Sequence, residues 1–219
     1  MASHGEHTVS DSTSSSGPLL QLLANGLNLW IRRQCDEVGD LNLVLNGSAL
    51  QLLRGHLKGV DLEGRQITFD GLPIQRAELS SGALNINLKP TQPGQLLQLQ
   101  EAFQIHGAVT MGGQDLNRAL VTERWRWLGD WLAEQLMGLT TLGNFEIDND
   151  TLVLTAPVIH DGEVVSKRYS LDATQGTIRI RRIETDGEVL LPMDANIQIE
   201  EAHLRGGQLH LKGRAAVTP

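Results

Sequence analysis

The sequence predicts an α+β protein in which a highly curved antiparallel sheet wraps around two long amphipathic helices. Two segments of the 219-residue chain repeat apolar residues at every third or fourth position, as amphipathic helices do. The other segments alternate apolar with polar residues and are joined by short turns such as Asp70-Gly71, which is typical of antiparallel strands. Strands follow strands without a regular helix between them, and this order excludes a doubly wound parallel fold.

The first helix is expected from Pro18 to about Cys35, because proline suits the first turn of a helix. Arg32 and Arg33 near its end suit the negative pole of the helix dipole. Its apolar residues recur at spacings of three and four and form one stripe, made of Leu19, Leu20, Leu23, Leu27, Trp30 and Ile31.

From Asp40 the apolar period changes to two, which predicts a series of strands up to about residue 88. The apolar residues change parity between Leu62 and Ile67, and this predicts a bulge or bend at Gly64. Two further shifts, near residues 75–76 and 81–82, predict a sheet that curls instead of lying flat.

The second long helix is expected from Asp115 to about Met137, with Gly138 as its C-cap. The apolar side of this helix consists of Leu116, Leu120, Trp127, Leu128, Trp131, Leu132 and Leu136. After it the alternating pattern returns and predicts hairpins as far as about residue 211.

Composition and charge exclude several classes of function. The net charge of −8 disfavours nucleic acid as a partner, and the single cysteine excludes a disulfide framework within the chain. Residues 1–17 are polar and rich in Ser and Thr, so we expect a disordered tail followed by one domain over residues 18–219. They lack the features of a signal peptide, and no stretch is apolar enough to span a bilayer. We therefore expect a cytoplasmic protein whose contact with any membrane is peripheral.

No catalytic or metal-binding motif is present. The seven histidines form neither an HxH nor an HExxH pattern, and no GxSxG, GxxxxGK[ST] or GxGxxG motif occurs. The acidic run at residues 148–150 lacks the glycine and the glutamate that an EF-hand loop needs. We expect a protein that is not an enzyme and that holds no metal or cofactor.

The tryptophans of the second helix suggest a binding role, although simple core packing is an alternative. An apolar groove between the helices and the sheet would be lined by Leu23, Leu27, Trp30, Ile31, Trp127, Leu128, Trp131 and Leu132. Trp125 lies about 160° around the helix from Trp127 and stands beside Arg124. An outward tryptophan next to arginine is typical of a lipid headgroup boundary, so we expect Arg124 and Trp125 to face a membrane.

Several segments resemble one known family. The resemblance is carried by LLRG at residues 52–55, GVDLEG at 59–64, FDGLPI at 69–74, the strand ending in NINL at 85–88, and VTMGGQDLNRAL at 109–120. In these segments the chain resembles the LmeA-like phospholipid-binding proteins, in particular their cyanobacterial members. The resemblance implies a fold similar to the tubular lipid-binding proteins, with an apolar groove between a long helix and a curved sheet. It also implies that the partner is a phospholipid.

Two functional hypotheses follow. The first is non-catalytic binding of a phospholipid or another apolar ligand, with transfer or sensing as its use. The second is a structural or protein-interaction module, in which the same apolar stripes form a fully packed core or the seam of a homodimer.

Overall fold

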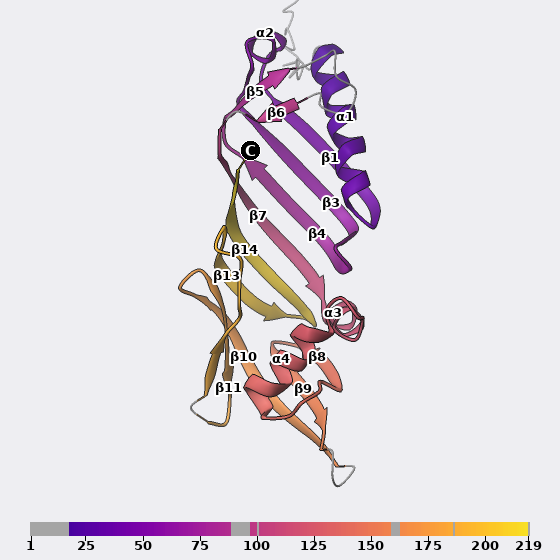
Figure 1. Cartoon of the computed structure of the whole chain (residues 1–219), viewed down its shortest axis with the longest axis vertical. Helices are drawn as coiled ribbons and strands as arrows, with labels where there is room; N and C mark the ends of the chain where they lie inside the picture. The colour runs from indigo at the N-terminus through magenta and orange to yellow at the C-terminus, as the bar shows by residue number, and fades with distance from the viewer. Residues whose placement is uncertain (1–17, 89–96, 100, 159–162, 186, 219) are drawn as a thin grey trace, which may run out of the picture.

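The computed structural model describes residues 18–88, 97–99, 101–158, 163–185 and 187–218 (Figure 1). The protein is α+β and its sheets are antiparallel, which confirms these two parts of the predicted fold, whereas the wrapping of the sheet around the helices stays a prediction. The predicted polar tail at residues 1–17 lies outside the described residues, and the single domain stays a prediction. The helices are α1 (Pro18–Gln34), α2 (Ala49–Leu53), α3 (Gly113–Leu120) and α4 (Arg126–Met137).

A six-stranded sheet forms the middle of the molecule. Its strands lie in the order β1 (Glu37–Asn46), β3 (Gly59–Phe69), β4 (Leu72–Ser81), β7 (Phe103–Gly112), β14 (Gln208–Val217) and β13 (Ile197–Arg205). The sheet is open, because β1 and β13 lie at opposite edges and do not pair with each other.

Two smaller sheets complete the fold. The five-stranded sheet has the order β12 (Glu188–Leu190), β11 (Thr177–Arg182), β10 (Val164–Thr174), β9 (Thr151–Pro157) and β8 (Asn144–Asp148). The three-stranded sheet has the order β2 (His56–Leu57), β5 (Leu84–Leu88) and β6 (Leu97–Leu99). Figure 1 shows them at opposite ends of the six-stranded sheet.

The hairpin turns follow from residues that accept a left-handed backbone. Asp70 and Gly71 have φ values of 54° and 75°, and their hairpin joins β3 to β4 where the sequence predicted it. The turns at Gln175-Gly176 and Gly206-Gly207 have the same signature, with φ positive at both residues. Two-residue loops of this kind twist in the same sense as the strands that they connect.

The expected irregularity in β3 lies two residues from its predicted position. The register of β3 with β1 and β4 runs without a shift through Gly64, so no bulge forms there. The backbone turns left-handed at Gln66, where φ is 52°. A side chain on Gly64 would collide with Cδ1 of Ile67, which explains the glycine at this position.

The predicted first helix is confirmed as α1. The prediction of one long second helix is wrong, because the structure has two helices there, α3 and α4. The chain leaves the helical path between α3 and α4 at residues 121–125. Thr122 closes α3, because its backbone N–H and its hydroxyl both donate to the carbonyl oxygen of Ala119, at 3.0 and 2.6 Å. Gly138 ends α4 in a left-handed conformation with φ of 71°, as predicted for the C-cap.

The apolar side chains form two separate cores. The N-terminal core lies where α1 and α2 meet the sheets and contains Leu20, Leu45, Leu52, Leu57, Leu84 and Ile86. The C-terminal core lies under α3 and α4 and includes Leu132, Leu136, Leu152, Leu154 and Tyr169. The central part of the six-stranded sheet therefore lies between the N-terminal core and the C-terminal core.

Candidate functional site

One face of the six-stranded sheet is apolar. Residues that are paired in register point to the same face of a sheet, so the register defines rows of side chains across it. One row runs through Leu43, Leu62, Leu79, Gly107 and Gly213. The next row runs through Leu41, Gly64, Ala77, Val109 and Leu211. We call the face that carries these two rows the apolar face.

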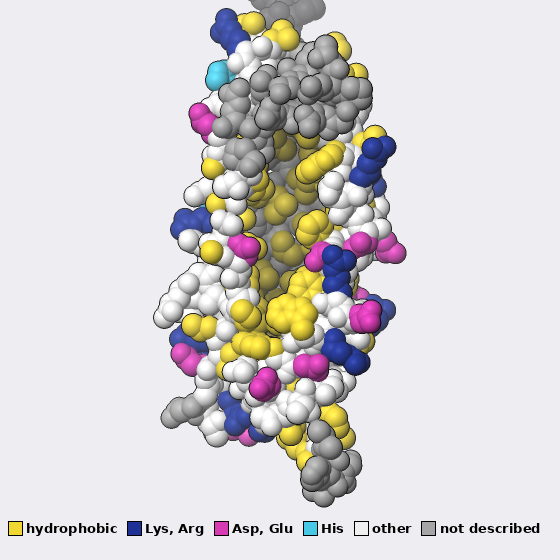
Figure 2. Space-filling view, viewed as in Figure 1, with side chains coloured by type: hydrophobic (Ala, Val, Ile, Leu, Met, Phe, Trp, Pro, Cys, Tyr) yellow, Lys and Arg dark blue, Asp and Glu magenta, His cyan; other side chains and the backbone are white. Residues whose placement is uncertain are grey.

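The apolar face is hollowed between the two cores. Leu62 and Leu79 are only half-buried and are not among the described residues that pack into either core. Figure 2, which shares the view of Figure 1, shows apolar side chains lining a long hollow over this sheet. Because only one of the two faces has apolar rows, the hollow lies on the apolar face.

Two adjacent glycines on the apolar face allow neighbouring groups to approach the sheet closely. Gly107 on β7 pairs with Gly213 on β14, so two neighbouring positions in one row have no side chain. The end of the Leu79 side chain occupies the space that a Cβ on Gly107 would need. A Cβ on Gly213 would collide with the backbone carbonyl oxygen of Gln198 on β13.

Helix α1 forms a wall along the β1 edge of the sheet. The Asn28 side-chain amide donates to the Leu41 carbonyl oxygen at 3.1 Å, and the Arg32 guanidinium donates to that of Val38 at 3.3 Å. These bonds satisfy carbonyl groups of an edge strand that pairs with a neighbour on one side only. The helix is therefore held beside the sheet, and the central strands of the apolar face stay open.

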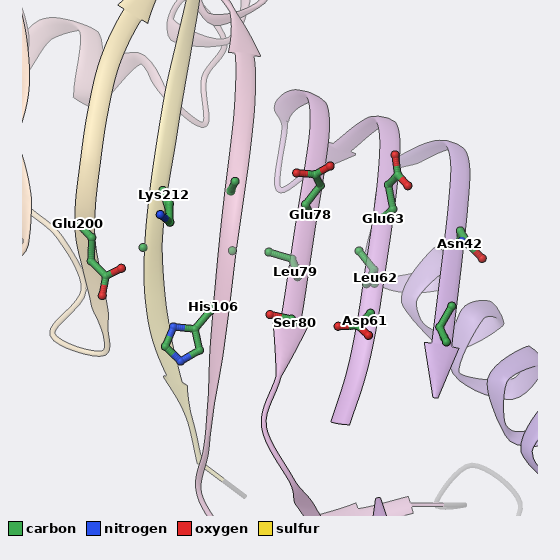
Figure 3. A pocket seen from close by; sticks show the side chains of 14 residues that line it. Asn42, Asp61, Leu62, Glu63, Glu78, Leu79, Ser80, His106, Glu200 and Lys212 are labelled. Carbon is green, nitrogen blue, oxygen red and sulfur yellow. The ribbon is translucent and has the colours of Figure 1, made fainter. Parts of the chain in front are cut away.

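The opposite face of the sheet carries charged rows and also contains a shallow hollow, of about 480 Å³, whose lining includes Leu62, Leu79, Gly107 and Gly213 beside the charged groups (Figure 3). Its carboxylates have partners, since Asp61 accepts from the Asn46 amide at 2.6 Å and Glu63 from Arg65 at 3.0 Å. Glu78 is paired with Arg76. Burying these groups under an apolar ligand would cost more than their solvated pairs return. The polar face is thus a poor site for a lipid.

Two further features of the described residues concern metal binding and the single cysteine. They contain no group of three His, Cys, Asp or Glu side chains placed to hold a metal ion. Burial and then the carboxylate of Asp36 raise the pKa of the Cys35 thiol, which keeps it protonated and weakly nucleophilic.

The predicted groove residues of the first helix lie around α1. Leu23 and Leu27 are half-buried against the N-terminal core, and Ile31 is half-buried as well. Trp30 is 58% exposed. The helix that carries these four residues walls the hollow on one side.

The predicted groove residues of the second helix lie at the other end of the sheet, on α4 (Figure 1). Leu132 is buried in the C-terminal core, and Leu128 and Trp131 pack half-buried against it. Trp127 is 54% exposed and stacks on Trp125, with ring centroids 6.2 Å apart. A role of these residues in lining a groove stays a prediction.

Arg124 and Trp125 both contact the turn between β3 and β4. The Trp125 indole N–H donates to the Asp70 carbonyl oxygen at 2.8 Å, and Arg124 pairs with the Asp70 carboxylate. These contacts connect the break between α3 and α4 to the end of the six-stranded sheet. Their predicted role in facing a membrane stays a prediction.

The floor of the hollow was not singled out from the sequence. Leu62, Leu79, Gly107 and Gly213 come from four different strands, and only the pairing of those strands brings them into one row. The sequence does contain one relevant signal. In each of two strands a glycine takes a position where the alternation calls for an apolar side chain, and such a glycine often marks a place where another group approaches the backbone closely.

None of the described helices is both long and apolar enough to cross a membrane. The family model described as LmeA-like phospholipid-binding matches residues 15–214, nearly the whole chain. No curated protein and no solved structure matches the chain.

Proposed function

Because the chain belongs to the LmeA-like phospholipid-binding family, we propose that it binds a phospholipid with the acyl chains on the apolar face of the six-stranded sheet. The observation that carries this proposal is the row of half-buried leucines and paired glycines in the hollow between the two cores. Half-buried apolar side chains in a concavity are a favourable surface for an apolar ligand.

Acyl chains suit this surface on energetic grounds. Each methylene group that leaves water contributes about 0.8 kcal/mol, so a chain that covers the row gains several kcal/mol. The two rows of the apolar face carry no charged side chain, so the headgroup is expected to stay at the mouth of the hollow. The open sheet and the wall made by α1 support an arrangement like that of the tubular lipid-binding proteins.

The proposed role is binding, with transfer or sensing as its use, and not catalysis. The Asp172 carboxylate and the Tyr169 phenol each take part in a contact that stabilises the fold. Asp172 is held by a two-point contact with Arg179, at 2.9 Å for both bonds. Tyr169 donates to the Leu136 carbonyl oxygen near the end of α4. Neither group borders the row of leucines and glycines on the apolar face.

A second copy of the chain is the competing occupant of the apolar face. In that case the protein is an interaction module, and the half-buried leucines form the seam of a homodimer. The oligomeric state of the purified protein separates this possibility from lipid binding.

Native mass spectrometry of the purified protein, followed by organic extraction and lipid identification, tests the proposed function. We expect a monomer with a near-stoichiometric added mass that matches an extractable phospholipid. A lipid-free mass that stays unchanged after incubation with phospholipid vesicles contradicts the proposal. A lipid-free dimer favours the interaction module instead.

A further inference from the structure

Helix α1 carries a second apolar arc that faces solvent. Leu22 is 72% exposed and Leu29 is 54% exposed, although the helix already buries Leu20 in the N-terminal core. At 100° per residue, Leu22 and Leu29 point within about 20° of each other. Gly26 and Arg33 lie in the same arc, within about 40° of Leu22. Large exposed leucines on one line of a helix mark an interaction surface more often than chance exposure does.

The arc lies away from the β1 edge of the sheet. Asn28 and Arg32 point at that edge, because their side chains donate to β1 carbonyl oxygens. Trp30 lies about 160° around the helix from both of them. Leu22 and Leu29 point about 160° and 180° away from Leu20, so the exposed arc lies on the side of α1 opposite the N-terminal core.

The two helical segments that carry these exposed leucines differ in charge from the chain as a whole. The segments 18–34 and 48–58 contain Arg32, Arg33, Arg54 and Lys58 but no Asp or Glu, whereas the whole chain has a net charge of −8. The second segment includes α2, which lies at the same end as α1 (Figure 1) and exposes Leu50 and Leu53, at 58% and 69%. Exposed leucines beside arginine and lysine match the two parts of an anionic lipid surface, its acyl boundary and its phosphates.

We propose that the exposed arc of α1, together with α2, docks on the surface of an anionic phospholipid bilayer. This inference rests on the proposed function and adds the surface through which the protein meets the membrane. A second copy of the chain fits this surface less well, because an isologous interface would place two basic patches against each other.

Flotation of the full-length protein with vesicles tests the docking surface. The vesicles contain phosphatidylcholine alone or phosphatidylcholine mixed with phosphatidylglycerol. We expect the wild type to float with the mixed vesicles, and to do so less as salt is raised, because the charge contribution is screened. The double variant Leu22→Ser/Leu29→Ser should lower the partition coefficient at least about tenfold, since it removes apolar area from the docking arc.

A matched control comes from the other end of the molecule. Val164 and Ile183 are 65% and 54% exposed, close to the values for Leu22 and Leu29. They belong to the five-stranded sheet and the segment that follows β11, so Val164→Ser/Ile183→Ser should float like the wild type. Equal flotation of the wild type and the Leu22→Ser/Leu29→Ser variant overturns the docking surface.

Binding of a monomeric short-chain phospholipid, below its critical micelle concentration, separates docking from ligand binding. The Leu22→Ser/Leu29→Ser variant should bind this probe as the wild type does, because neither leucine lies on the apolar face. Wild-type protein that binds the probe but floats with neither kind of vesicle overturns the docking surface and leaves the proposed function standing. Wild-type protein that does not bind the probe removes the proposed function, and the docking proposal falls with it.

Discussion

Gly107 on β7 and Gly213 on β14 face each other in register at the centre of the apolar face. Leu79, the next residue in the same row, extends over Gly107, so the floor of the hollow is one leucine followed by two bare backbone positions. Most sheet faces that pack a core carry branched side chains at such positions. Here the two glycines instead let the Leu79 side chain and the β13 backbone approach the sheet closely.

A charge in the central row of the apolar face should weaken ligand binding without unfolding the protein. Leu79→Glu places a carboxylate in the row that the acyl chains would cover, and burying it unpaired is costly. Because Leu79 is half-buried, we expect only a small loss of stability but a drop of at least about tenfold in affinity for a short-chain phospholipid. A binding titration followed by fluorescence measures the effect.

Ser80→Glu is the matched control for Leu79→Glu, because Ser80 follows on the same strand and points to the polar face (Figure 3). It introduces the same charge and should leave the affinity unchanged. If both variants lose binding to the same extent, the ligand does not lie on the apolar face.

Gly213 should be irreplaceable for a backbone reason. In Gly213→Ala the new methyl group meets the Gln198 carbonyl oxygen, which cannot move without shifting β13. We expect a loss of about 1–3 kcal/mol in the free energy of unfolding, measured by urea denaturation. Gly26→Ala in α1 is the comparison, since nothing lies within 4 Å of its Cβ position. That substitution should stabilise the protein by about 0.5–1 kcal/mol, and a similar loss in both variants would refute the steric explanation.

The buried phenol of Tyr169 should make the protein sensitive to alkali. Its hydroxyl donates to the Leu136 carbonyl oxygen at 3.0 Å, and burial raises its pKa above the ordinary value in spite of the nearby Arg182. The unfolded chain then loses this proton near pH 10 while the folded protein keeps it, so stability falls as pH rises above about 10. The chain has one tyrosine, so its ionisation can be followed directly by ultraviolet absorbance.

Tyr169→Phe checks the same contact by stability. The Leu136 carbonyl oxygen keeps a bond from Arg182 at 2.6 Å, so we expect a loss of only about 1 kcal/mol at neutral pH. The tyrosine-dependent part of the alkaline loss should disappear in the variant. A tyrosine that titrates at its ordinary pKa in the folded wild type would contradict the assignment.

Asp172 should contribute stability that disappears in acid. The bonds from Arg179, helped by the charges of Arg179 and Arg181, hold the pKa of the Asp172 carboxyl below its ordinary value. A lowered pKa in the folded state means that the contribution is present above the ordinary value, near 4, and is lost as the pH falls through the lowered one. Asp172→Asn should therefore be less stable than the wild type at neutral pH, and the difference should shrink in acid. A difference that does not change with pH would rule out this explanation.

Local patterns predicted most of the strands and the first helix. Alternation in β1, β4 and β7 and the Asp70-Gly71 turn depend on neighbouring residues alone, so they could be recognised without knowing the fold. The break between α3 and α4 could not. It accompanies a contact between Trp125 and the Asp70 carbonyl oxygen, which are 55 positions apart, while the apolar spacing continues through the break.

The candidate site was harder to predict than the fold. The tryptophans of the predicted second helix favoured Trp127 and Trp131 as groove residues, yet the central row of the apolar face consists of Leu62, Leu79, Gly107 and Gly213. Each of these positions is ordinary within its own strand. Their meaning comes from the pairing of β4 with β7 and of β7 with β14, which joins segments far apart in the sequence.

Photocrosslinking with a phospholipid that carries a diazirine on its acyl chain tests the central claim most directly. If the acyl chains lie on the apolar face, labelled peptides should come from β3, β4, β7 and β14, with the label at Leu62 or Leu79 and not at Ser80 or His106 on the polar face. An excess of unlabelled short-chain phospholipid should remove this labelling. Labelling that favours the polar face, or that the competitor does not reduce, would contradict the account.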